Sequence, residues 1–333
     1  MQAWWVGRWG RAGVWLAWLI VISVAAGCGS APSASPSSGS PGPTAGPTGP
    51  TVAPGSSAPS TPGATVQVPT PPAATPTGAG PSPATSPGPT SSMVVFLLRD
   101  EHLVPVERTL AAGRAVVTAA VESLLAGPTD EEARPAGGSQ GLTSAIPAGT
   151  SLLGITISGA IADVNLSGRF ASGGGSASMF ARLAQVVYTV TQVPTVTGVT
   201  FRLDGRAVTT FSSEGIVLSR PSERADFRAN LPPIFLERPA WGARVSSPVR
   251  LQGLANVFEA QFQAEIATAD GTVIAHRAVT ASCGTGCWGA FDTVLAYRLD
   301  RTQSGWVTVY DLSPRDGARE HVRSYPVMLT SSP

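Results

Sequence analysis

Met93-Val94-Val95-Phe96-Leu97-Leu98 is the stretch at which the chain changes from a composition that cannot build a hydrophobic core to one that can. A short continuous apolar run predicts a strand that is covered on both faces, and residues 103–110 follow closely enough to pair with it. From Arg114 onward the spacing changes, because apolar residues over 116–125 recur at helical intervals. Gly127-Pro128 supplies the stop signal for that helix.

The same region contains signals for several more elements. We expect strands at 152–157 and 160–166, a helix at 179–190 and a strand at 196–203. Ser158-Gly159 fits a tight turn between the first two of these strands, and Ser176 fits the cap of the helix. The order of elements predicts a small α+β domain over residues 93–220, with two helices on one face of a sheet.

The sequence pattern of the C-terminal region predicts an all-β structure. Between Phe258 and Ala267 apolar and mostly polar residues alternate, which is typical of a half-buried strand. The other strands expected are 234–238, 249–254, 272–280, 288–297, 306–312 and 320–329. Asp270-Gly271 and Asp316-Gly317 are turn signals between them. Short strands at this spacing predict an antiparallel, immunoglobulin-like β-sandwich over residues 232–330, after a domain break rich in Pro and charge at 220–233.

The N-terminus has the three-part layout of a secretory signal over residues 1–27. Arg8 and Arg11 precede an apolar segment, which ends in small residues before Cys28. The sequence Val24-Ala25-Ala26-Gly27-Cys28 resembles a bacterial lipobox, with Ala25 where Leu is usual. The resemblance implies that Cys28 is diacylated and becomes the new N-terminus, anchored to the membrane on its extracytoplasmic face. The alternatives are an uncleaved anchor or an ordinary secretion signal, and each of the three exports the bulk of the chain.

Residues 28–92 are expected to form a disordered linker. Residues 29–92 contain neither a charge nor an aromatic ring and are rich in Pro, Gly, Ser, Thr and Ala, so no large apolar group offsets the entropy of ordering. A chain of this length and Pro content spans between about 45 Å and about 200 Å.

The charge distribution of the sequence does not indicate an electrostatic partner. The formal net charge is +1, and all 22 basic residues are Arg, scattered singly along the sequence. A nucleic-acid partner would require a clustered basic face, so this class is disfavoured.

The three cysteines fit an exported protein. If Cys28 is acylated, Cys283 and Cys287 remain as a pair four residues apart around Gly284-Thr285-Gly286, and a hairpin turn at this spacing brings their Cα atoms within bonding range. A disulfide is the favoured interpretation. Free thiols are an alternative, as is a zinc site with His276 as third ligand, which lacks a fourth ligand.

Several fragments mimic catalytic or ligand-binding motifs. Ser139 lies in a Gly-x-Ser-x-Gly string, but a loop precedes and follows it, where a hydrolase would have a strand and a helix. The glycine-rich segment 172–176 lacks the Lys and Ser/Thr of a phosphate loop. The remaining polar candidates, each without a nucleophile or a paired carboxylate beside it, are His102, His276, His321, Asp163 and Asp204. We therefore predict no catalytic residue, no metal and no cofactor.

Aromatic rings of a β-sandwich can stack on sugars or peptides. Core packing is the usual role for rings within strands, as expected of Trp288, Tyr297, Trp306 and Tyr310. Trp241 lies in the loop Pro239-Ala240-Trp241-Gly242 and is therefore the weak candidate for an exposed, ligand-binding ring.

Both regions resemble known families. The first contains the segments 124–128, 146–150, 162–167, 187–192 and 201–205, which together resemble the GerMN domain of sporulation and spore-germination proteins. The second contains the segments 255–260, 288–291 and 313–317, which resemble the immunoglobulin-like domain that accompanies GerMN in bacterial germination-type proteins. The resemblance implies a role in sporulation, germination or a related envelope process, with GerMN domains similar to the ring-building modules of secretion-like assemblies.

Three hypotheses for function follow. The favoured one is a non-enzymatic lipoprotein that associates with envelope or cell-wall proteins or with itself. The second is a cell-wall or carbohydrate-binding module that uses Trp241. The third is an envelope hydrolase that uses Ser139 or a histidine.

Overall fold

The computed structural model describes residues 90–111, 115–135 and 140–332. The predicted leader, Cys28, nearly all of the predicted linker and Ser139 lie outside these ranges. Every described residue belongs to one compact unit.

The first region begins with a long hairpin. Strand β1 (Thr90–Arg99) pairs antiparallel with β2 (His102–Ala111), so the predicted pairing of these segments is confirmed. The strand starts at Thr90 and not at Met93, and residues 90–92 therefore belong to the hairpin rather than to the linker.

Helices α1 (Val116–Leu125) and α2 (Ser176–Val190) form where apolar residues recur at helical spacing, as predicted. Leu124 of α1 and Leu183 of α2 are fully buried, as the amphipathic pattern requires. The predicted cap is wrong. Gly175 holds the N-cap position of α2, and the hydroxyl of Ser176 instead donates a hydrogen bond to Glu214.

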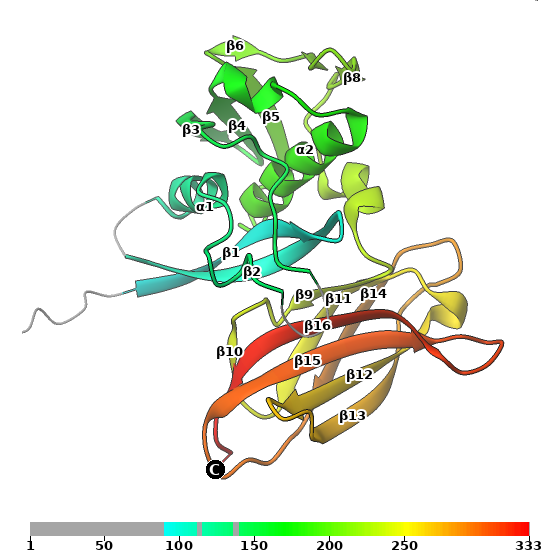
Figure 1. Ribbon diagram of the computed structural model, residues 1–333. Coiled ribbons are helices and arrows are strands. Elements are labelled where there is room, and N and C mark those ends of the chain that lie inside the picture. The colour runs from blue at the N-terminus through cyan, green and yellow to red at the C-terminus, as the bar shows by residue number, and fades with distance from the viewer. Residues whose placement is uncertain (1–89, 112–114, 136–139, 333) are drawn as a thin grey trace, which may run out of the picture. The chain divides into compact units, whose positions relative to one another are not determined.

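A four-stranded sheet packs on the helices. Its strand order is β3 (Leu152–Ser158), β4 (Ile161–Leu166), β5 (Gly198–Leu203) and β6 (Arg206–Ala207). Strands β4 and β5 run parallel, and the other neighbours run antiparallel. The fold class of two helices on a sheet is confirmed. The β1–β2 hairpin is a separate sheet, and Figure 1 shows the helices between the hairpin and the four-stranded sheet.

Short elements complete this region. They are the 3-10 helices η1 (Gly168–Ala171) and η2 (Arg224–Asn230) and the short hairpin of β7 (Thr210–Phe211) with β8 (Ile216–Val217). Helix η2 lies in the predicted domain break, where a capping box at Glu223 and Asp226 starts it. It packs against α2 and buries Phe227, so this stretch is structured and belongs to the packing of the first region.

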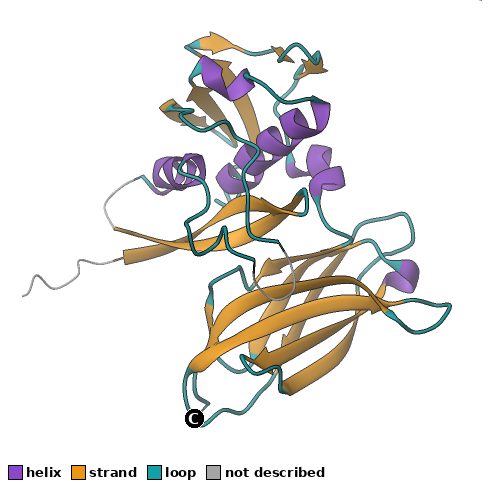
Figure 2. Ribbon diagram, viewed as in Figure 1, coloured by secondary structure: helices purple, strands orange, loops and turns teal. Residues whose placement is uncertain are grey.

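The C-terminal region is all β, as predicted, and its strands form two sheets (Figure 2). One sheet has the order β14 (Gly289–Leu295), β11 (Val249–Ala255) and β9 (Ile234–Arg238). The other has the order β10 (Arg244–Val245), β16 (Arg319–Leu329), β15 (Gln303–Leu312), β12 (Gln261–Thr268) and β13 (Val273–Thr280). The short β10, which sequence did not indicate, pairs parallel with β16, so the sandwich is not purely antiparallel.

The alternating segment forms a strand over only part of its predicted length. Residues 258–260 form a 3-10 turn, η3 (Phe258–Ala260), and the side chain of Phe258 is 53% exposed. From Gln261 onward the apolar residues Phe262, Ala264 and Ile266 are buried as predicted. Glu265 on the polar face is buried too, where it accepts a hydrogen bond from Tyr310 and pairs with Arg319.

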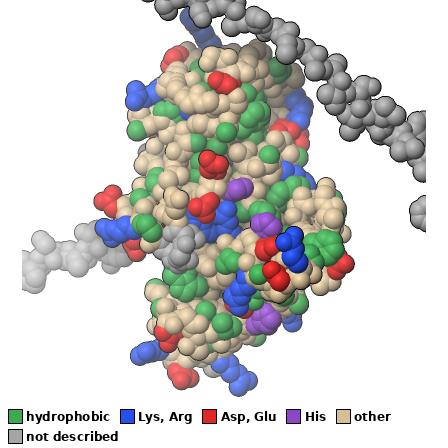
Figure 3. All heavy atoms as spheres, turned by 45° about the vertical axis from the view of Figure 1, so that its right-hand side comes forward, with side chains coloured by type: hydrophobic (Ala, Val, Ile, Leu, Met, Phe, Trp, Pro, Cys, Tyr) green, Lys and Arg blue, Asp and Glu red, His purple; other side chains and the backbone are tan. Residues whose placement is uncertain are grey.

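The molecular surface has no large region of one charge on the face shown in Figure 3, where acidic and basic side chains are interspersed. This matches the scattered Arg residues of the sequence. None of the helices in the described part of the chain has the length and apolar character needed to span a bilayer.

Candidate functional site

The two regions meet through three aromatic rings. Phe96 of β1, Tyr188 of α2 and Phe235 of β9 are each at most 1% exposed. Their ring centroids are 5.3 Å apart for Phe96 and Tyr188, 5.9 Å for Tyr188 and Phe235, and 6.3 Å for Phe96 and Phe235. These contacts join the α+β region to the first strand of the sandwich in one continuous core.

Arg224 covers two of these rings. Its guanidinium carbon lies 4.7 Å from the ring centroid of Tyr188 and 5.5 Å from that of Phe96. It donates hydrogen bonds to Glu237 Oε1 at 2.6 Å and to Thr191 Oγ1 at 2.8 Å. Burial raises the pKa of Tyr188 to about 12, so this phenol stays neutral.

Trp241 lies at the same junction between the two regions. Its ring is therefore not exposed, although it lies in a loop. Its side chain is 6% exposed. Its backbone N–H donates to Pro105 O at 2.8 Å, and its carbonyl accepts from Glu107 N at 2.9 Å, so the loop adds a short bridge to β2. The interpretation of an accessible stacking ring is wrong because long-range packing, which a single sequence does not show, covers the indole.

A buried arginine lies against the Trp241 ring. Arg99 is 1% exposed, and its guanidinium carbon is 5.3 Å from the Trp241 centroid and 5.5 Å from the Tyr325 centroid. Nη1 donates to Ser324 O at 2.7 Å, whereas Nε, Nη2 and the Tyr325 hydroxyl have no hydrogen-bond partner within the described structure. Burial lowers the pKa of Arg99 and raises that of Tyr325. Sequence reasoning missed Arg99, whose one visible signal is that a charged residue directly ends the apolar run 93–98.

A second arginine ties the hairpin turn to the sandwich. Arg323 of β16 donates to Asp100 Oδ2 at 3.1 Å and to Arg99 O at 3.2 Å. The turn residues Asp100 and Glu101 have φ values of +50° and +65°. Both central residues of a type I′ hairpin turn take such left-handed values, which Asp tolerates better than Glu does.

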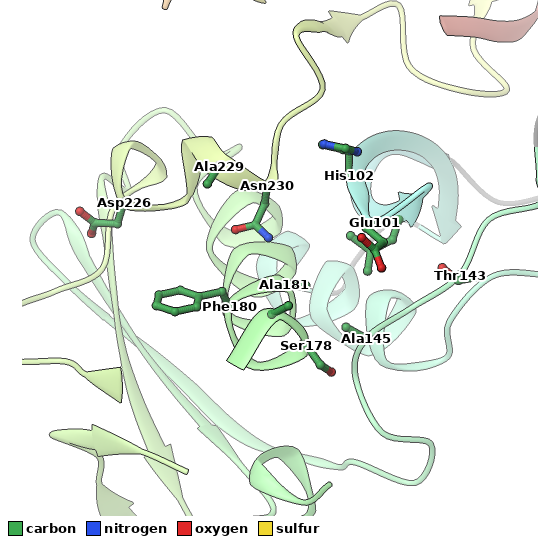
Figure 4. Close-up of a pocket in the computed structure, with 12 residues that line it drawn as sticks. Glu101, His102, Thr143, Ala145, Ser178, Phe180, Ala181, Asp226, Ala229 and Asn230 are labelled. Carbon is green, nitrogen blue, oxygen red and sulfur yellow. The ribbon is translucent and has the colours of Figure 1, made fainter. Parts of the chain in front are cut away.

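A pocket of about 550 Å³ lies beside this turn (Figure 4). Its walls come from the hairpin turn, the loop that contains Thr143 and Ala145, the first half of α2, and η2. The lining is mostly apolar, and the polar groups at its rim include Glu101, His102, Asp226 and Asn230. Pockets of this size and character commonly bind small molecules.

Some of the polar side chains at the pocket rim already make hydrogen bonds within the protein, and others do not. Asp226 accepts hydrogen bonds from Arg220 and from the backbone of Glu223. The side chains of Glu101 and Asn230 have no hydrogen-bond partner among the described residues. His102 is half buried, and its Nδ1 lies 2.6 Å from Asp100 O and 3.3 Å from Arg323 Nη2. His102 is therefore not a fully solvated side chain, whereas His276 and His321 are exposed.

The other predicted polar candidates are held in structural contacts. The glycine-rich segment before α2 directs carbonyls of Ser172 and Gly173 at the buried Arg182, at 3.0 Å and 2.6 Å, so it binds a cation and offers no anion cradle there. Asp163 pairs with Arg202, and Asp204 accepts from the backbone of Gly168. Within the described ranges, none of the three histidines is hydrogen-bonded to a serine, threonine or cysteine.

The cysteine pair and one side-chain cluster are the groups with metal-ligand chemistry. Cys283 and Cys287 are joined as a disulfide with Cα atoms 5.9 Å apart, so neither sulfur is a thiolate ligand. Asp311, Glu320 and His321 place one ligand atom each within 4.8 Å of one another. His321 Nδ1 lies 2.8 Å from Asp311 Oδ1, and this pairing accounts for the cluster without an ion.

Fold and contacts define a two-domain protein, in which an α+β domain and a β-sandwich share a buried junction. Residues 94–209 match the Germane family model, described as "Sporulation and spore germination". Residues 233–318 match the Gmad2 model, described as "Immunoglobulin-like domain of bacterial spore germination". The chain therefore contains a GerMN domain followed by an immunoglobulin-like domain of bacterial spore germination, as the sequence resemblance implied.

Solved structures show distant similarity. The tandem GerMN domains of the Bacillus subtilis sporulation protein GerM are 15% identical with a TM-score of 0.37, covering 73% of this chain and 61% of that one. The first GerMN domain of the same protein is 19% identical with a TM-score of 0.32, covering 41% of this chain and 100% of that one. A Clostridium perfringens protein described as a "Putative Lipoprotein" is 20% identical with a TM-score of 0.30, covering 41% of this chain and 89% of that one. No protein with a curated function matches the chain.

Proposed function

We propose that this protein is a non-enzymatic lipoprotein that acts as a protein-association module in sporulation, germination or a related envelope process. Lipidated Cys28 holds it on the outer face of the membrane, and residues 29–89 serve as a tether. Its partners are envelope or cell-wall proteins or further copies of itself.

The buried junction is the observation that carries this proposal. Phe96, Tyr188 and Phe235 form one core across both domains, and Trp241 and Arg99 add a second set of contacts. Domains fixed in this way present their outer surfaces in one orientation, which favours binding to another protein over motion around a substrate. The two family models name sporulation and germination and no reaction.

The alternative of a wall-binding module has lost its main support, because the Trp241 ring is buried. The hydrolase alternative rests on Ser139, which lies outside the described residues, and on histidines whose observed hydrogen bonds do not include a nucleophile.

Crosslinking in the native host tests the proposal. We expect a tagged full chain to crosslink to envelope proteins or to itself in the membrane fraction, and a Cys28→Ser chain to leave that fraction. A full chain that forms no crosslinked species, or that hydrolyses wall fragments, would overturn the assignment. Adjacency of the gene to sporulation genes or to wall enzymes would identify the process.

A further inference from the structure

We propose that the pocket beside α2 binds a basic side chain, arginine or lysine, presented by a partner protein. This inference rests on the proposed association function and assigns it a specific site. Three features support it: the shape of the pocket, its one free carboxylate, and the contacts by which the sandwich holds the turn that carries this carboxylate.

The walls fit the apolar stem of a long side chain. Leu98, Ala145, Ala177 and Ala181 line the pocket together with the ring of Phe180, which is 41% exposed. Small alanine side chains leave the volume of about 550 Å³ open, and arginine and lysine bury their methylene stems along such surfaces. Figure 4 shows Ala181, Ser178 and Asn230 on one side and Glu101, Thr143 and Ala145 on the other.

The rim supplies acceptors for the charged end. Glu101 offers a carboxylate and Asn230 a carboxamide oxygen, and neither side chain is hydrogen-bonded elsewhere in the described structure. The neighbouring arginines are already engaged, because Arg220 pairs with Asp226 and Arg323 pairs with Asp100. The unpaired charge at the rim is therefore negative, which favours a cation over an anion.

The position of Glu101 is set by contacts outside the pocket. Glu101 has φ +65°, an unfavourable conformation that persists when the surroundings fix it. Arg323 of β16 fixes it by binding the side chain of Asp100 at 3.1 Å and the carbonyl of Arg99 at 3.2 Å. These contacts fix the backbone of the turn, and with it the point from which the Glu101 side chain reaches the pocket rim.

The chain's own tether is a poor occupant. Residues 29–92 contain no charged residue and therefore offer nothing to Glu101. The tether is therefore not the source of the proposed cation.

A titration with two matched probes tests the proposal on the chain from residue 29 to 333, which keeps all described residues. The probes are N-acetyl-arginine amide and the uncharged N-acetyl-norleucine amide, and chemical shifts are followed at the amides of His102, Ala181 and Asn230. We expect the arginine probe to bind about fivefold more tightly than norleucine, as one partly exposed charge pair predicts. Glu101→Gln should remove that preference, and Ala177→Trp, at an exposed position on the pocket wall, should abolish binding of both probes.

Glu131→Gln is the matched control, because Glu131 is exposed and does not line the pocket. Equal binding of both probes, unchanged arginine binding in Glu101→Gln, or no shifts at the pocket would overturn the inference. Tighter binding of N-acetyl-glutamate amide than of the arginine probe would also overturn it. If the probe experiment fails while native crosslinks are found, the association function stands and uses another surface. If the probe binds but no crosslinked species forms, the pocket binds cations, and the partner protein is removed from both proposals.

Discussion

Replacing Trp241 by alanine separates a packing role from a ligand-binding role. The indole is 6% exposed and lies against the guanidinium of Arg99 at the domain junction. Its removal leaves a cavity, and it also leaves a buried arginine without one of its two aromatic partners. We therefore expect Trp241→Ala to destabilise the folded chain without any ligand present.

The magnitude follows from the buried area. A buried tryptophan removes roughly 150–250 Å² from water, which at about 25 cal/mol per Å² corresponds to about 4–6 kcal/mol. Truncations of buried aromatic residues to alanine cost about 3–5 kcal/mol, and the lost cation–π contact adds about 1 kcal/mol. A loss of about 4–6 kcal/mol is a large fraction of the roughly 5–15 kcal/mol that stabilises a typical domain.

Urea unfolding followed by far-ultraviolet circular dichroism measures this loss, and Trp306→Ala is the comparison. Trp306 is half buried on β15, so we expect a smaller loss of about 1–2 kcal/mol there. A Trp241→Ala chain that loses less than about 1 kcal/mol would refute the packing argument. Loss of binding to purified peptidoglycan at unchanged stability would restore the ligand-binding role.

Three further predictions concern other buried or constrained groups. Burial holds the pKa of Tyr188 at about 12 against 10.0 for an ordinary tyrosine, so its stabilising contribution is complete below pH 10 and lost as pH rises to 12. Between pH 10 and 12 the unfolding free energy of the wild type should therefore fall by about 2–3 kcal/mol more than that of Tyr188→Phe. Equal slopes of unfolding free energy against pH in the two proteins would contradict this prediction. Replacing Cys283 and Cys287 together by serine should cost only about 2 kcal/mol, because the closed loop is short, and a loss of cooperative unfolding would show that the disulfide does more. Gly284→Ala should cost more than that double variant, because the new Cβ would lie 2.3 Å from Ala260 N, and a smaller shift in urea midpoint than the cysteine change would contradict it.

Local sequence patterns predicted helices and turns correctly where tertiary packing buries the same face that the pattern indicates. The helical spacing of 116–125 and 179–190 has the expected structure, and the turn predicted at Ser158-Gly159 lies one residue later, at Gly159-Ala160. Gly159 takes a φ value of +59°, which glycine adopts without strain, and this explains why it is a reliable turn signal. In such segments the conformational preference of a few residues and the burial of one face point to the same structure.

Contacts between distant segments were beyond the reach of one sequence. The burial of Trp241 depends on β2, more than a hundred residues earlier in the chain, and the hydrogen bond of Arg99 depends on Ser324. Phe258 departs from its alternating pattern because residues 258–260 turn before the strand begins. The pocket was missed for the same reason, since Glu101, Ser178 and Asn230 meet only after the hairpin, α2 and η2 have packed.

The junction gives a physical reason for the two domains to act as one body. Arg323, a residue of the immunoglobulin-like domain, holds Asp100 and with it the strained turn that places Glu101 at the pocket of the GerMN domain. Arg323 is itself 8% exposed, so breaking this pair leaves a buried cation uncompensated, a change that typically costs several kcal/mol. The sandwich therefore contributes to the binding surface of its neighbour without lining it. An isolated GerMN domain would lose both this contact and the Phe235 ring, and its turn would relax away from the conformation that directs Glu101 to the pocket rim.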